Sequence, residues 1–205
     1  MGGDYYDYVP FGDGRLGIVC GDVMGKGLAA ALIMAMARSL LHNAVSNGKG
    51  AGEILAEVND GLTRDLAGQR LPYFLTLALA VYDPLDRTVT IAGGGHNPVL
   101  LVGRDGLREL PSRGAALGVR SRLEFAEDVI SSQPGDLVAL YTDGLTEARD
   151  PNGRLYGLER LKIALAGYQD LAAPDILGAL WGDVGGFRSG APPRDDTTLL
   201  LARFR

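Results

Sequence analysis

Five short segments rich in glycine and aspartate, spread along most of the chain, constrain its fold more than any other feature. Three of them place an aspartate at the end of an apolar run with a glycine beside it. A strand that ends in this way offers a carboxylate at a sheet edge, on a backbone that is free to bend around a bound ion. Without cysteine or histidine partners, such carboxylates predict an all-oxygen site for a hard cation such as Mg²⁺ or Mn²⁺. The segments are GGD at 2–4, GDVMGKG at 21–27, GGHNP at 94–98, YTDG at 141–144 and DDTT at 195–198.

The composition indicates a single domain with a sizeable core. The chain has 205 residues, 46% of them apolar, and no segment that resembles a linker, so we assign residues 1–205 to one domain. The net charge of −5 argues against a surface that binds nucleic acid. No apolar run approaches the length of a membrane span; the run at 28–36 is followed by Arg38. The single cysteine, Cys20, lies in an apolar run and predicts a buried thiol in the reducing cytoplasm.

Hydrophobic periodicity predicts an α+β fold. A strand comes first, then a pair of helices, then a run of strands, and finally two helices and a closing strand. This order is typical of sheets that pack on each other with helices outside. The predicted strands are 15–23, 73–82, 88–92, 98–102, 123–130, 136–142 and 197–204, and the predicted helices are 28–47, 52–66, 158–165 and 174–180.

Taken together and in this order, the five segments resemble those of the PP2C-type metal-dependent serine/threonine phosphatases, and most closely the bacterial branch of SpoIIE and RsbU-like phosphatases. The resemblance extends from Gly2 to Leu200. It implies a PP2C-like α-β-β-α sandwich, with two packed antiparallel β-sheets flanked by helices and a metal centre between the sheets. Members of this family have a strand and usually a helix before the first segment. We therefore expect the domain to be N-terminally truncated, with the first strand of the family fold missing.

The resemblance also implies a role for each acidic residue. Asp22 would bridge two metal ions, Mn²⁺ or Mg²⁺, and the carbonyl of Val23 would bind the second ion. Asp143 and Asp195 would complete the shell of the first ion, and Asp4 would bind the second ion directly or through water. Asp22 and Asp143 are thus the expected catalytic residues. Two such ions would activate a water for in-line displacement, and they would remove the repulsion among the crowded carboxylates.

The function implied by the resemblance is hydrolysis of phosphoserine or phosphothreonine on a protein. The substrate expected from this branch is an anti-sigma-factor antagonist in bacterial sigma-factor partner switching. The full-length protein would carry an upstream sensor domain. Neither a nucleic acid nor a membrane is an expected partner.

Taken singly, each aspartate has a plainer interpretation. Asp4, Asp22 and Asp143 adjoin glycines, where aspartate is common because its side chain bonds the turn backbone. Asp195 would then simply solvate the start of the last strand. The ordered set of segments favours the metal-ligand interpretation for these four residues. Three further aspartates are expected at the surface or behind the metal ligands, namely Asp7, Asp136 and Asp196.

The remaining polar residues of the segments are expected to support the site. We expect Thr142 and Thr198 to orient backbone or carboxylate groups. His42 lies in a predicted helix and is expected at the surface or its boundary. His96 is expected to be structural, in the turn formed by Asn97 before a proline, with a supporting role behind the metal ligands as the alternative.

Two positions near the first long helix bear on catalysis. Animal members of the superfamily have a histidine two residues after the bridging aspartate, and here that position is Met24, which leaves the general acid open. Lys26 precedes the helix and is a candidate for binding phosphate together with the helix N-terminus, although a solvated lysine explains it equally well. Asp4 lies close to the start of the sequence, so we expect it to fray and to hold its ion less tightly.

Two other functions compete with hydrolysis. One is a catalytically silent, phosphatase-like module that binds phosphoproteins, and the presence of all four matched carboxylates argues against it. The other is a nucleotide cyclase, because GGD resembles the start of the GGDEF motif. Here Tyr5 and Tyr6 replace the last two residues of that motif, which argues against the cyclase.

Overall fold

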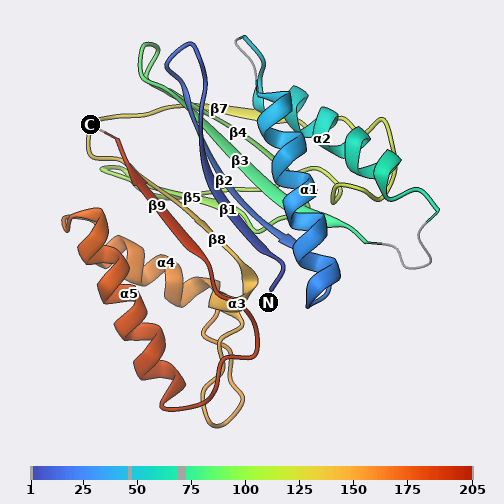
Figure 1. Cartoon of the computed structure of the whole chain (residues 1–205). Coiled ribbons are helices and arrows are strands. Elements are labelled where there is room, and N and C mark those ends of the chain that lie inside the picture. Colours follow the sequence, from blue (N-terminus) through green and yellow to red (C-terminus); the bar gives the residue numbers. More distant parts are fainter. Residues whose placement is uncertain (1, 46–47, 69–72, 205) are drawn as a thin grey trace.

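The chain folds into four layers, with two antiparallel sheets face to face and helices on the outer side of each (Figure 1). This computed structural model describes residues 2–45, 48–68 and 73–204. The larger sheet has the strand order β1-β2-β3-β4-β7, and the smaller sheet has the order β6-β5-β8-β9. Their bounds are β1 Asp4–Pro10, β2 Leu16–Val23, β3 Leu75–Asp83, β4 Thr88–Gly94, β5 Val99–Gly103, β6 Gly106–Leu110, β7 Glu127–Ser131, β8 Leu137–Tyr141 and β9 Leu199–Arg203.

The helices begin where the sequence supplies a local cause. Gly27 adopts φ 84°, which turns the chain out of β2 and into the first helix. The second helix is capped by Glu53, which accepts a hydrogen bond from the Gly50 amide at 3.0 Å. Pro174 occupies the first turn of the last helix, where its missing N–H costs nothing. The helices are α1 Leu28–Ala44, α2 Ala51–Asp65, α3 Asp143–Thr146, α4 Leu158–Gly167 and α5 Ala173–Arg188. None of the described helices is both long and apolar enough to cross a membrane.

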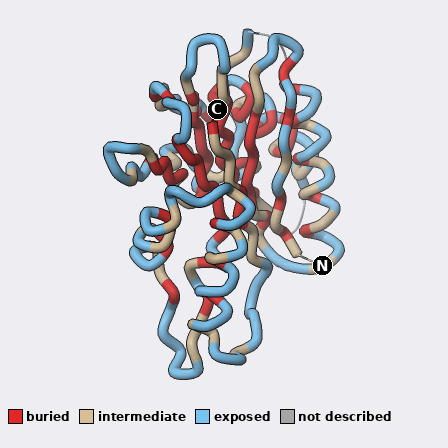
Figure 2. Tube along the Cα trace, turned by 90° about the vertical axis from the view of Figure 1, so that its left-hand side faces the viewer, coloured by how far each residue is buried: buried red, intermediate tan, exposed pale blue. Residues whose placement is uncertain are grey.

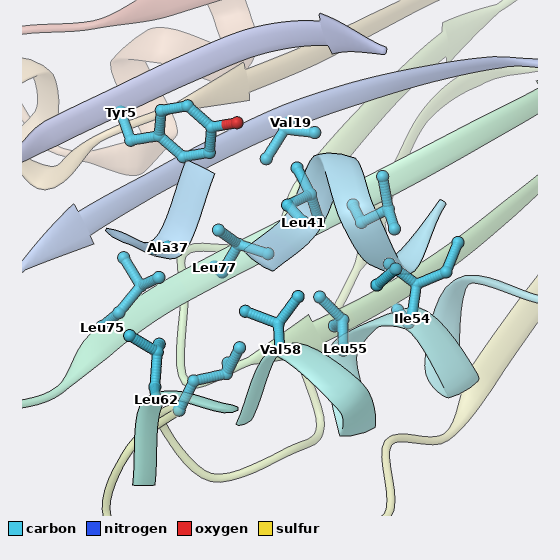
Figure 3. Packing of buried hydrophobic residues seen from close by; sticks show 14 of the residues in the cluster. Tyr5, Val19, Ala37, Leu41, Ile54, Leu55, Val58, Leu62, Leu75 and Leu77 are labelled. Carbon is cyan, nitrogen blue, oxygen red and sulfur yellow. The ribbon is translucent and has the colours of Figure 1, made fainter. Parts of the chain in front are cut away.

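Three apolar layers hold these elements together. Helices α1 and α2 pack on the outer face of the larger sheet, where Leu41, Leu55 and Leu77 are completely or almost completely buried (Figure 3). A second layer fills the space between the sheets, and a third lies between the smaller sheet and helices α4 and α5. Buried residues accordingly follow the strands, and exposed residues follow the loops and the outer helix faces (Figure 2).

The predicted fold class is confirmed, and each predicted strand and helix has a counterpart. Strand β7 starts later than expected, because Leu123 and Phe125 precede it and pack with the α1 and α2 layer instead. Helix α5 extends well beyond its predicted end at 180. Residues 46–47, at the end of the predicted first helix, lie outside the described residues. The expected absence of a strand before β1 stays a prediction.

Three elements were not predicted: β1, β6 and α3. Strand β1 has the sequence DYYDYVP, in which polar residues obscure the apolar alternation. Its pattern is nevertheless that of a half-buried strand, because Tyr5 and Val9 are buried while Tyr6 and Tyr8 are exposed.

Removal of a side chain from the outer core tests this packing. Leu55→Ala should lower the free energy of unfolding by about 2–5 kcal/mol, because it leaves a cavity among fully buried neighbours. Leu85→Ala is the matched control, since Leu85 is 86% exposed in the turn after β3, and its effect should stay within about 0.5 kcal/mol. Urea unfolding measures both. Equal losses for the two variants would contradict this description of the core.

Candidate metal centre

The candidate site lies at one end of the layer between the two sheets, where apolar strand faces become polar. In β2, Ile18 and Cys20 face the other sheet and are buried. Side chains alternate along a strand, so Asp22 continues the same face. Strand β1 pairs with β2 in a register that sets Asp4 opposite Asp22. The first two predicted ligands are therefore neighbours on the sheet.

The smaller sheet reaches the same place from the other side. Thr142 follows β8, Thr198 precedes β9, and both continue the buried inward faces of those strands. Their hydroxyls donate to Oδ2 of Asp4 at 2.8 Å and 2.6 Å, respectively. These bonds confirm that the two threonines orient a carboxylate. The expectation that Asp4 frays is wrong, because strand pairing holds its backbone and the smaller sheet holds its side chain.

Asp143 and Asp195 come from the loops next to these threonines. Asp143 is the first residue of α3 and comes directly after Thr142, and Asp195 lies in the loop that leads to β9. Figure 1 shows α3 beside the start of β1, in agreement with the bond from Thr142 to Asp4. All four predicted aspartates thus lie at the same end of the sandwich.

Glycines allow the segments to approach closely. A Cβ on Gly3 would collide with the carbonyl oxygen of Val23, the predicted metal-binding carbonyl, and would lie 2.8 Å from Oδ1 of Asp22. A Cβ on Gly144 would collide with the carbonyl oxygen of Asp196. Gly3 and Gly144, beside the aspartates, are therefore needed for space.

The carboxylates raise each other's proton affinity. Burial is the largest cause that raises the pKa of Asp22, and the negative charges of four neighbouring aspartates raise it as well, to about 7 in all; these neighbours are Asp4, Asp143, Asp195 and Asp196. Burial also raises the pKa of Asp4, although the hydrogen bonds from Thr198 and Thr142 oppose this effect. Gathered oxygen ligands that repel one another fit a divalent cation, which would remove the repulsion.

The side chains are gathered but do not converge on one point. Among the described residues, no three aspartate, glutamate, histidine or cysteine side chains lie close enough together to hold one ion. Asp195 instead points to Lys26, whose Nζ lies 3.2 Å from Oδ1 and also donates to the carbonyl of Arg194 at 2.9 Å. The assignment of Asp4, Asp22, Val23, Asp143 and Asp195 as metal ligands, and of Lys26 as a phosphate ligand, stays a prediction.

A cavity of about 330 Å³ opens beside Asp22 and Asp143 and is lined also by Met24, Thr76 and His96. His96 is buried, and its Nδ1 lies 2.9 Å from the hydroxyl of Thr76. Burial lowers the pKa of His96 to about 4, so its ring is neutral at pH 7. The same Thr76 hydroxyl lies 3.4 Å from the backbone oxygen of Asp22. The His96 side chain therefore links its turn to Thr76 of β3 and also borders the cavity.

Thr76 belongs to no recognisable motif, and only the strand register places it opposite Asp22.

Two other polar residues lie away from the site, as expected. Asp7 faces α1, where Oδ2 lies 2.7 Å from Nε2 of the exposed His42. Asp136 accepts a hydrogen bond from the backbone of the turn before β8.

The raised pKa of Asp22 gives a pH dependence to the stability of the metal-free protein. Between about pH 4 and pH 7 the folded chain binds a proton that the unfolded chain releases, so stability falls as pH rises. In EDTA, the melting temperature of Asp22→Asn should therefore exceed that of the wild type by a margin that grows as pH rises through this window. Asp105→Asn, in the turn between β5 and β6, is the control and should show a constant offset. A melting difference for Asp22→Asn that does not change with pH would contradict the assigned shift.

Comparisons with known proteins agree with the motifs. The family model described as Stage II sporulation protein E (SpoIIE) matches residues 12–205. The chain is 29% identical over 225 residues to protein IcfG of Synechocystis sp., covering 98% of this chain and 35% of IcfG. It is 28% identical over 157 residues to phosphoserine phosphatase RsbU of Bacillus subtilis, covering 76% of this chain and 46% of RsbU. The chain thus spans less than half the length of either curated relative.

Solved structures share the fold. The SiaA-PP2C domain of Pseudomonas aeruginosa superimposes with a TM-score of 0.88 at 24% identity, covering 100% of this chain and 81% of that one. RsbX in complex with magnesium gives a TM-score of 0.74 at 16% identity, covering 100% of this chain and 88% of that one. These likenesses confirm the predicted sandwich. Since the family model matches nearly the whole sequence, the chain belongs to the SpoIIE family and has the fold of PP2C domains.

Proposed function

We propose that this chain is a metal-dependent protein serine/threonine phosphatase. The observation that carries the proposal is the gathering of Asp4, Asp22, Asp143 and Asp195 at one end of the sandwich, where Asp22 and Asp143 border a cavity. The similarity to RsbU, a phosphoserine phosphatase, supports the reaction. The magnesium in the RsbX structure supports a hard divalent cation, Mn²⁺ or Mg²⁺, as the cofactor.

The residues that would hold the two ions come from both sheets. Asp22 would contact both of two ions, Asp143 and Asp195 would hold the first, and Asp4 with the Val23 carbonyl would hold the second. When bound, such ions supply charge neutralisation for the phosphate and activation of a water. The hydrogen bonds from Thr142 and Thr198 would orient Asp4 toward its ion and oppose the rise in its pKa that burial causes.

The other residues around the carboxylates limit which side chain could donate a proton to the leaving group. His96 does not serve as a cationic acid at neutral pH, because its pKa is about 4. Met24 has no proton to give. Lys26 lies at the edge of the carboxylates and would be released from Asp195 for a phosphate oxygen if Asp195 turned to a cation.

The biological setting is part of the proposal. A phosphoprotein of the anti-sigma-factor-antagonist type is the proposed substrate, and RsbU and RsbP of Bacillus subtilis, both phosphoserine phosphatases, support its phosphoserine chemistry. We also propose that residues 1–205 act as one catalytic domain under an upstream sensor domain, and that the protein works in the cytoplasm. The fully buried Cys20 is compatible with a reducing compartment.

Metal dependence is the first test of this function. Hydrolysis of p-nitrophenyl phosphate should stop in EDTA and return with Mn²⁺. Asp22→Asn and Asp143→Asn should each lower kcat by at least about 100-fold, because activation and charge stabilisation are lost together. Asp105→Asn, at a distant turn, is the matched control and should keep wild-type kcat. Full activity of Asp22→Asn would refute the site, and binding of a phosphoprotein without any turnover would favour a silent module.

Substrate class is the second test. Phosphoserine and phosphothreonine peptides should be hydrolysed with higher kcat/KM than a phosphotyrosine peptide of the same flanking sequence. The comparison uses phosphate release at saturating Mn²⁺. A marked preference for phosphotyrosine would contradict the proposed class.

A further inference from the structure

A second, smaller cavity also borders the segment that carries Asp143. Its volume is about 100 Å³, and its lining includes Gly144, the residue after Asp143, and also Asp195. The first cavity borders Asp143 itself. The two cavities therefore border successive residues of one segment, Asp143 and Gly144, and a substrate that places its phosphate beside Asp143 brings its neighbouring residues toward the second cavity.

Three arginines from three separate segments line this second cavity. Arg149 follows α3, Arg188 is the last residue of α5, and Arg194 immediately precedes Asp195. Arg149 donates to the carbonyl of Gly153 at 3.0 Å, and Arg188 donates to the hydroxyl of Thr197 at 3.4 Å. A guanidinium group has five N–H donors, so most of these donors stay available.

The charge around the arginines is not balanced within the described residues. None of the three arginines has an ion-pair partner there. Glu147 and Asp195 are the carboxylates in the lining, and Asp195 pairs with Lys26. Pro192 and Pro193 stiffen the loop that presents Arg194, which reduces the entropy lost when an anion is held.

We propose that this arginine pocket binds an oxyanion on the substrate protein, either an acidic side chain or a second phosphoryl group next to the phosphoserine. The inference rests on the proposed phosphatase function and adds a determinant of substrate choice. Arginine recognises carboxylate and phosphate in the same bidentate manner, so the chemistry is shared by both sources. The volume of about 100 Å³ suits a single compact anionic group.

The test is a set of phosphoserine peptides that differ only in their flanking residues. Glutamate, a second phosphoserine, alanine and lysine are placed in turn on either side of the scissile phosphoserine. With the wild type, the kcat/KM for an acidic peptide should exceed that for the alanine peptide by about tenfold. Whichever acidic flank gives the larger ratio identifies the source of the oxyanion.

Variants then assign the preference to the pocket. Arg194→Gln should reduce the acidic-to-alanine ratio severalfold, and Arg149→Gln with Arg194→Gln should bring it close to one. Arg194 suits the first variant because its side chain makes no hydrogen bond among the described residues. Arg104→Gln, on the exposed turn between β5 and β6, is the matched control and should keep the wild-type ratio. Melting temperatures verify that all variants fold.

The outcomes separate this inference from the proposed function. Equal kcat/KM for acidic, alanine and lysine peptides, or an acidic preference that survives the double variant, overturns the pocket while phosphatase activity stands. If no peptide is hydrolysed in Mn²⁺, the proposed function fails. Binding of the same peptides, measured by fluorescence anisotropy, then tests whether the pocket recognises an acidic flank. Tighter binding of acidic peptides that is lost in the double variant supports it, and unchanged binding refutes it.

Discussion

The buried apolar layer between the two sheets is the constraint on which the rest of the structure depends. Ile18 and Cys20 from one sheet and Leu140 and Leu200 from the other are removed from water only if the sheets stack face to face. Strand alternation then determines which residues come next on these faces, and at one end they are polar, with Asp22 among them. Segments that are far apart in the sequence meet there because their strands already belong to the same layer.

The site is costly for the fold that builds it. Partly buried carboxylates resist ionisation, as the pKa of about 7 for Asp22 shows. Hydroxyl donors from Thr142 and Thr198 reduce this cost at Asp4, and glycines let the backbones come close without collisions. Local conflicts of this kind are expected where function, and not stability, selects the residues.

The sequence predicts those parts of the site that depend on short-range pattern. Asp22 and Asp143 each end an apolar run, and this alone indicates a sheet-edge carboxylate. Thr76 reaches the site only through its register with β2, and register depends on contacts between distant segments. The arginine pocket is less predictable still, because it needs the spacing of α3, α5 and the loop before β9.

Strand β1 was missed for a related reason. Its exposed residues Tyr6 and Tyr8 are as large as its buried Tyr5, so residue type does not reveal which face is buried. Its pairing with β2 is what places Asp4 beside Asp22 and within reach of the threonines of the smaller sheet. The prediction that Asp4 frays failed because it considered only distance along the chain.

The division of the carboxylates between the two sheets has a consequence for the lifetime of the protein. Asp4 and Asp22 belong to the larger sheet, and Asp143 follows a strand of the smaller one. A cation bound by carboxylates of both sheets would cross-link the two halves of the sandwich. A free cation concentration a hundredfold above the dissociation constant would add about 2.7 kcal/mol to the free energy of unfolding. Loss of the ion would then make the chain easier for proteases to cleave and would also abolish its activity. The supply of metal would therefore set the amount of protein present in addition to its catalytic rate.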